Sequence, residues 1–196
     1  MKPDTDKSLI PDYLFHVAQG FYDVGLQLAH YIKKEESVKG FQRIAPAAMN
    51  FTFAIELMLK GLHSLTTRMN FKTHKLWDLY KQLPPDIKQR IEDKYNIYKS
   101  LKFDDLTAIR AVVKPNNGTG NEEKTNDADE ISDLKDLLLI HNNAFEDWRY
   151  LYEVQPNGYI YEFNFKLVNA FTMALSEVIN EIKSGLKPSF VIGRAK

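Results

Sequence analysis

The sequence lacks cysteine, a charge excess of either sign, and any long run of apolar residues. Without cysteine the chain cannot form a disulfide, a thiolate metal site or a thiol nucleophile. Lysine plus arginine and aspartate plus glutamate number 26 each, so nucleic acid could be attracted only by a local basic patch. No run approaches about 18 apolar residues, and the first residues carry no apolar signal segment. We therefore expect a cytoplasmic protein with no membrane-spanning helix.

The composition that remains is that of an ordinary soluble protein. Hydrophobic residues make up 44% of the 196 residues and charged residues 27%, which predicts a single domain, 1–196, with a sizeable core. The segments 1–10 and 186–196 are expected to be flexible tails. Residues 114–130 contain Ala128 as their single aliphatic side chain, so they cannot bury themselves and are predicted to form a mobile surface loop.

Helical periodicity dominates the chain. Apolar residues recur at three- and four-residue steps, which predicts amphipathic helices. From Ala45 to Leu62 they appear on every side, so this helix is expected to be buried all round. Residues 100–113 fit either a helix or an extended segment, and 159–163 favour a short extended piece. The predicted fold class is all-α, an up-and-down bundle of five to six helices at about 11–34, 42–66, 74–83, 86–98, 134–153 and 162–183.

The helix predicted over 134–153 carries a polar stripe beside its apolar face. Asn142, Glu146, Arg149 and Glu153 follow one another at steps of four, three and four residues, so they line up on one side of a helix. A guanidinium held between two carboxylates beside aromatic side chains can bind an anion, take part in catalysis, or serve as a structural clasp. All three roles are open at this point.

Glu56 is the most constrained charged residue of the sequence. It lies midway along the helix that is apolar on all sides, where an unpaired carboxylate would cost several kcal/mol, on the order of a broken buried ion pair. Lys60, one turn later, and Arg149 are candidate partners, and we predict an ion pair between Glu56 and Arg149. Such a pair would either pin two helices together or place an acid in a functional site. His141 falls on the apolar stripe of the late helix and is either a core residue or a general acid–base group.

Two further histidines lie near Glu56 in the sequence. The spacing of His63 and His74 from Glu56 matches no recognised set of metal ligands, so we expect no metal site, and no cofactor motif accompanies them. Thr73 is predicted to be the N-cap of the short helix that follows it, which gives His74 a structural place at a helix start.

The order of these elements resembles a known family. The residues that carry the resemblance are Ala54–Lys60, which read AIELMLK, then His74–Leu79, which read HKLWDL, and the late AFEDWRYLYE over 144–153. Over roughly residues 11–184 the chain resembles the HEPN superfamily of helical bundles. The resemblance implies a homodimer in which the two sites face each other. Active HEPN proteins are metal-independent endoribonucleases, many of them toxins or phage-defence proteins, whereas others bind nucleotides or partner proteins.

The chain departs from the family's catalytic signature, an arginine followed after four to six residues by a histidine on the late helix. Arg149 stands where that arginine is expected, but no histidine follows His141, and Glu153 lies four residues after the arginine instead. The spacing itself occurs at Arg68 and His74, in the connection before the short helix. The departure implies that this chain has lost the family's catalytic pair.

We therefore expect a catalytically degenerate HEPN-like module of bacterial or phage defence or of a toxin–antitoxin system. It would bind a partner protein or a nucleotide- or RNA-like ligand through Asn142, Glu146, Glu153 and Lys60. A ribonuclease is the alternative, with Arg149 stabilising the charge of the transition state and His141 or Glu56 transferring protons. A helical scaffold with no chemistry of its own is the third hypothesis.

Overall fold

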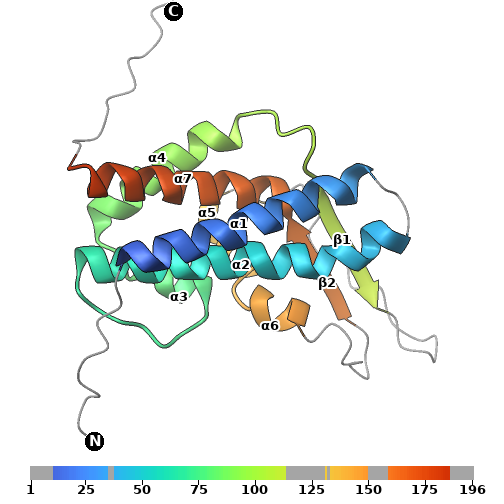
Figure 1. Ribbon diagram of the computed structural model, residues 1–196, viewed down its shortest axis with the longest axis horizontal. Helices are drawn as coiled ribbons and strands as arrows, with labels where there is room; N and C mark the ends of the chain where they lie inside the picture. The colour runs from blue at the N-terminus through green and yellow to red at the C-terminus, as the bar shows by residue number, and fades with distance from the viewer. Residues whose placement is uncertain (1–10, 35–37, 114–130, 132, 150–158, 186–196) are drawn as a thin grey trace, which may run out of the picture.

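The computed structural model describes residues 11–34, 38–113, 131, 133–149 and 159–185. Within these residues the protein is mostly helical, which confirms the predicted all-α bundle, and one short two-stranded sheet is added at one end (Figure 1). Both predicted tails, the predicted loop and Glu153 lie outside the described residues. No helix in the described part of the chain is both long and apolar enough to cross a membrane.

The longest helices form an antiparallel pair. Helix α1 (Pro11–Lys34) lies along α2 (Val38–Thr66) over most of its length (Figure 1). Gly61 allows this contact, because a Cβ there would stand 2.4 Å from the ring of Phe15 on α1. Gly25 has the same role from the other side, since its Cβ would meet the Phe51 backbone nitrogen at 3.2 Å. Close helix approach at small residues therefore sets the position of α2 in the bundle.

Helix α2 is the central element, as its sequence predicts. Its side chains are buried on several sides of the helix, including Phe51, Ile55 and Leu62. The short helix α3 (Leu76–Lys81) and then α4 (Pro85–Lys99) follow it, and α4 packs against the last helix, α7 (Phe165–Lys183).

An ion cluster joins α4 to α7. Arg90 bonds one oxygen of Glu181 at 2.7 Å, and Lys94 bonds the other at 3.0 Å. Lys94 also pairs with Glu177, which accepts a hydrogen bond from the Tyr98 hydroxyl at 2.7 Å. These five residues, called the α4–α7 ion cluster below, fix the relative position of two helices that are distant in the sequence.

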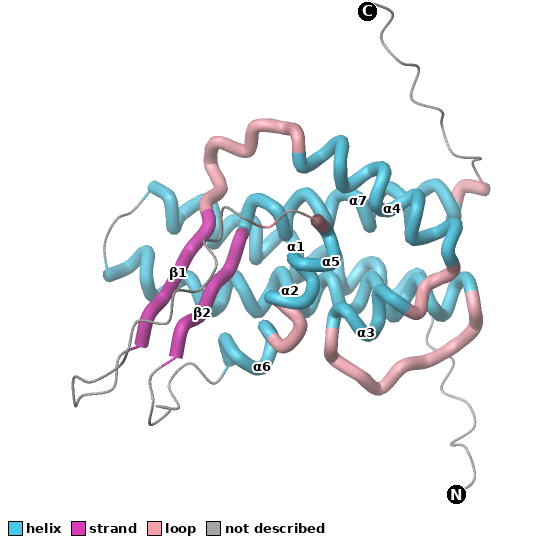
Figure 2. The backbone as a smooth tube through the Cα atoms, turned by 180° about the vertical axis from the view of Figure 1, so that it is seen from behind, coloured by secondary structure: helices cyan, strands magenta, loops and turns pink. Residues whose placement is uncertain are grey.

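The late helix is interrupted, so the prediction of one continuous helix over 134–153 is wrong. Helix α5 (Leu134–Ile140) ends at His141, and α6 (Ala144–Arg149) begins after a short turn. In this turn the backbone N–H groups of Asn142 and Ala144 bond carbonyls three residues back rather than four. The His141 and Asn142 side chains form hydrogen bonds with backbone groups elsewhere in the fold. Such bonds compete with helix continuation, and hydrophobic periodicity gives no information about them. Figure 2 shows α3, α5 and α6 on one side of the molecule.

The two strands form an antiparallel pair at one end of the bundle. Strand β1 (Ala108–Val113) pairs with β2 (Tyr159–Asn164) over their whole length, with Ala108 opposite Asn164 and Val113 opposite Tyr159 (Figure 2). The extended piece predicted at 159–163 is thus confirmed. Of the segment 100–113, which fitted either a helix or an extended segment, residues 108–113 form a strand. Strand β2 passes directly into α7, where the Asn164 side chain caps the helix by accepting the Leu167 N–H at 3.0 Å.

Candidate functional site

A cleft of about 230 Å³ lies between the segment that leads into α3 and the turn that joins α5 to α6. Most of its lining side chains are polar or charged, and Phe145 supplies an apolar surface. Neither wall is predicted by periodicity, because both are irregular backbone between short helices. The lining residues are Thr73, His74, Lys75, Asn142, Asn143, Phe145 and Glu146.

The carboxylate of Glu56 lies behind this cleft. Its side chain is 2% exposed, and its Oε1 atom accepts from Lys60 Nζ at 2.8 Å and contacts His74 Nδ1 at 2.9 Å. The predicted ion pair with Arg149 is therefore wrong, since the partners of Glu56 in the described residues are Lys60 and His74. The connection after α2 folds back over its own helix, so a residue 18 positions away reaches the carboxylate before the late helix does. The Oε2 atom of Glu56 is buried and has no hydrogen-bond partner in the described part of the chain.

His74 joins the buried carboxylate to the cleft. Its side chain is 56% exposed, and Nδ1 is directed to Glu56, which leaves Nε2 without a partner among the described residues. Sequence reasoning gave His74 a role at a helix start and missed this contact. Two features of the sequence could have predicted this contact. A buried Glu56 needs partners, and no other acidic residue lies between Glu56 and His74 to pair with this histidine.

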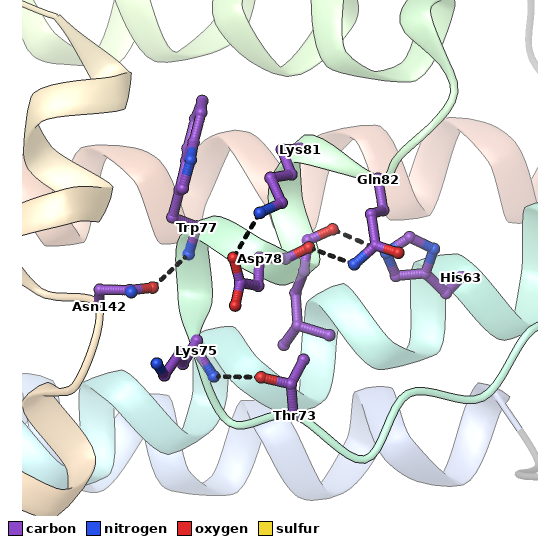
Figure 3. A network of polar contacts seen from close by, with 9 residues as sticks. His63, Thr73, Lys75, Trp77, Asp78, Lys81, Gln82 and Asn142 are labelled. Carbon is purple, nitrogen blue, oxygen red and sulfur yellow. Dashed lines mark hydrogen bonds and ion pairs between the residues drawn. The ribbon is translucent and has the colours of Figure 1, made fainter.

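The wall formed by α3 is fixed by the opposite wall. The Asn142 side-chain oxygen accepts the backbone N–H of Trp77 at 2.9 Å, which satisfies an N–H of the first turn of α3 (Figure 3). The predicted N-cap is wrong, because Lys75 holds the capping position, and Thr73 instead accepts the Lys75 backbone N–H at 3.1 Å. The Asn142 amide nitrogen remains available to donate to a ligand. Asn142, predicted to bind a ligand, lines the cleft and also positions the opposite wall.

His141, predicted to be either a core residue or a general acid–base group, lies in the core of the structure, and both of its ring nitrogens are bonded to the backbone. It is 2% exposed, and its Nε2 accepts the Asn164 backbone N–H at 3.2 Å. Its Nδ1 therefore carries the proton and donates to the Leu137 carbonyl at 2.8 Å. Burial lowers the pKa of His141 to about 4, because desolvation of the charged imidazole outweighs the bond to Leu137.

The polar stripe predicted on the late helix is only partly assembled. Glu146 is exposed and lines the cleft, whereas Arg149 is exposed on α6 and is not among the residues that line it. Lys60, predicted to bind a ligand, is 13% exposed and is paired with Glu56. Asp147 is half-buried on α6, and burial, with a smaller contribution from Glu146, raises the pKa of its carboxyl group. The interruption of the helix separates residues that an unbroken helix would align.

A basic connection borders the cleft. No aspartate or glutamate occurs between Glu56 and Asp78, and within this interval Arg68, Lys72 and Lys75 are exposed. In a chain with no net charge, this stretch therefore carries exposed cations with no acidic residue between them in the sequence, a pattern that favours an anionic ligand.

The described residues contain no group of three or more histidine, aspartate or glutamate side chains that could hold a metal ion. The lining side chains of the cleft offer hydrogen-bond donors and acceptors, charges of both signs and the imidazole of His74. No family model, no curated protein and no solved structure matches the chain.

Proposed function

We propose that the protein is a HEPN-like helical binding module that takes a nucleotide- or RNA-like ligand in the cleft between 73–75 and 142–146. One observation carries the proposal: the polar groups of the cleft are already oriented. Glu56 holds the His74 ring at Nδ1, and the Trp77 N–H holds the Asn142 amide at its oxygen. The remaining Nε2 and amide N–H groups need little reordering to meet a ligand, and such preorganisation favours affinity.

Charge supports an anionic ligand. The exposed cations Arg68, Lys72 and Lys75 lie in one connection, and Lys75 lines the cleft itself. Cations clustered in this way attract phosphate groups and raise association rates at low ionic strength. The partner-protein form of the hypothesis has no comparable support from the cleft, whose volume of about 230 Å³ is suited to a small ligand or part of a strand.

Binding of a short fluorescent single-stranded RNA, measured by anisotropy, tests the proposal. We expect Lys75→Ala to weaken binding about tenfold, the effect of one charge-assisted hydrogen bond. Lys81→Ala is the matched control, because this lysine lies on α3 in an exposed pair with Asp78 and does not line the cleft. Equal losses in both variants would mean that only diffuse charge matters. An unchanged affinity in Lys75→Ala would place the ligand elsewhere.

A metal-independent endoribonuclease is the second candidate, and the Glu56–His74 contact favours it. An imidazole whose Nδ1–H is held by a carboxylate is oriented to accept a proton at Nε2, as a general base requires. His74 would then take the 2′-hydroxyl proton in place of His141. Cleavage in the presence of chelator that is lost in His74→Ala and kept in Arg149→Ala would promote this candidate. Absence of cleavage in the wild type would leave the binding module.

The homodimer and the role in defence or in a toxin–antitoxin system are parts of the proposal that rest on the resemblance alone. Light scattering tests the first, since a monomer has a mass of 22.7 kDa and a dimer twice that value. A monomer at all concentrations would contradict it. Plaque counts on bacteria with and without the protein test the second, and equal counts together with equal growth would contradict it.

A further inference from the structure

The donors of the cleft come from both of its walls. His74 and Lys75 precede α3, and Asn142 belongs to the turn between α5 and α6. The Asn142 oxygen is used by Trp77, so this side chain presents its amide N–H groups to the cleft. Lys75 has no carboxylate partner in the described residues and presents its ammonium group. Donors that converge from two sides of a cleft fit an oxyanion.

His74 completes this set only when it is protonated. The neutral ring with Nδ1–H on Glu56 presents Nε2 as an acceptor, whereas the protonated ring donates from both nitrogens. The charged groups around the ring are Glu56 and Lys60 from α2, Lys75 on its own segment, and Glu146 from α6. Glu56 is already paired with Lys60, so a proton on His74 adds one net positive charge to the wall of the cleft.

Glu146 sets the second requirement of the ligand. It is exposed and lines the same cleft, where its carboxylate repels an anion and accepts hydrogen bonds from hydroxyl or amino groups. Phe145 next to it offers an apolar surface. A bare inorganic anion would satisfy the donors but gain nothing from Glu146.

We infer that the cleft binds a small phosphorylated molecule that also carries hydroxyl or amino donors, and that protonation of His74 strengthens this binding. The phosphate lies at Lys75, His74 and the Asn142 amide, and the donors face Glu146. A nucleoside monophosphate and a sugar phosphate share this chemistry. The inference deepens the proposed function and rests on it, since both use the same cleft.

Binding measured by NMR titration of the full chain tests the inference with four probes: ribose 5-phosphate, adenosine 5′-monophosphate, ribose and sulfate. Sulfate is a tetrahedral dianion that does not titrate near neutral pH, so any pH dependence of its binding comes from the protein. We expect both phosphorylated probes to bind about tenfold more tightly than sulfate or ribose, because only they engage donors and Glu146 together. Equal affinity for sulfate and ribose 5-phosphate would overturn the role of Glu146. A preference between the two phosphorylated probes shows whether the ligand is a nucleoside monophosphate or a sugar phosphate.

Variants separate the two halves of the inference. Lowering the pH from about 8 to about 5.5 should tighten sulfate binding about fivefold in the wild type, because the ring donates from Nε2 only in its protonated form. His74→Gln should abolish that dependence, whereas Lys81→Ala should retain it. Glu146→Gln should tighten sulfate and weaken ribose 5-phosphate. Dependence on pH that persists in His74→Gln would overturn the protonation step.

The outcomes also distinguish this inference from the proposed function. RNA that binds in a Lys75-dependent way, with no effect of pH or of Glu146→Gln, would keep the proposed function and overturn the inference. Lack of binding by every probe and by RNA would overturn both. Titration of the His74 ring resonances in the absence of ligand adds a direct check, because a ring that stays in one protonation state between about pH 5.5 and pH 8 contradicts the switch.

Discussion

Two buried carboxylates of this protein meet cations, and they meet them differently. In the α4–α7 ion cluster both oxygens of Glu181 are bonded, one by Arg90 and one by Lys94. Behind the cleft, both partners of Glu56 share Oε1, while Oε2 has no hydrogen-bond partner in the described residues. A fully bonded carboxylate between two helices is a structural clasp. A partly bonded carboxylate that contacts an exposed histidine suits the binding or proton-transfer site proposed above.

The pKa shifts of Glu181 and Lys94 support the interpretation of the α4–α7 ion cluster as a structural clasp. Burial alone would raise the pKa of Glu181, but hydrogen bonds from Arg90 and Lys94 outweigh it and lower that pKa. Burial would likewise lower the pKa of Lys94, and bonds to Glu177 and Glu181 outweigh it and raise that pKa. Both groups are therefore held in their charged forms, which suits a permanent clasp and offers nothing to a ligand near neutral pH.

The largest effect on stability is expected in the cluster. Lys94→Met should lower the free energy of unfolding by about 3–5 kcal/mol, because it leaves Glu177 without its lysine and Glu181 with Arg90 alone in a poorly hydrated interface. Urea unfolding followed by circular dichroism measures the loss. Lys81→Met, which breaks an exposed pair with Asp78, should cost less than about 1 kcal/mol. Similar losses in both variants would show that the cluster is no more than a surface feature.

The buried His141, in the turn between α5 and α6, should make stability depend on pH. The folded-state pKa of His141 lies at about 4, below the ordinary value of 6.5, so the unfolded chain binds the proton more strongly. Stability is therefore complete above about pH 6.5 and falls as the pH is lowered toward 4. Between pH 7 and pH 5 this group should remove on the order of 2 kcal/mol. His63, whose pKa burial also lowers, acts in the same direction.

His141→Gln is the control for that pH dependence, because the amide can still bond in place of the ring and does not titrate. Urea unfolding at the two pH values should give a clearly smaller difference in the variant than in the wild type. An equal difference in both proteins would assign the pH dependence to other groups.

A smaller loss is expected at the contact that joins the two walls of the cleft. Asn142→Ala leaves the Trp77 backbone N–H without its acceptor and should cost about 1 kcal/mol, the usual value of a helix cap. Hydrogen exchange of the Trp77 amide should accelerate in the same variant. Asn143→Ala, an exposed neighbour, is the matched control, and equal exchange rates in the two variants would contradict the bond.

The smallest effect on stability, and the sharpest test of the comparison, is expected for His74→Ala. Its side chain is more than half exposed, and Lys60 stays on Glu56, so the free energy of unfolding should change by less than about 1 kcal/mol. Ligand binding should nevertheless fall about tenfold. A loss of stability as large as that of Lys94→Met would mean that the Glu56–His74 contact is a second clasp.

Much of the fold follows from local pattern. The all-round apolar character of α2 predicts its central place, and the three- and four-residue steps of 162–183 predict α7 almost to its ends. The break at 141–143 escaped this reasoning, because the periodicity of Leu134, Leu137 and Leu138 continues formally into 145 and 148. At the end of α5, the His141 ring accepts the Asn164 backbone N–H and the Asn142 side chain accepts the Trp77 backbone N–H. Both donors are remote in the sequence.

By itself the sequence determined an all-α bundle, the position of its most buried helix and the presence of one carboxylate in need of partners. These are consequences of hydrophobic periodicity and of the cost of burying charge, both of which can be read along the chain. Only the tertiary structure decided that His74 and not Arg149 meets Glu56, and that His141 is buried in the core with both ring nitrogens bonded to the backbone. The choice depends on how an irregular connection folds back over α2, and contacts of irregular backbone are set by packing and not by periodicity.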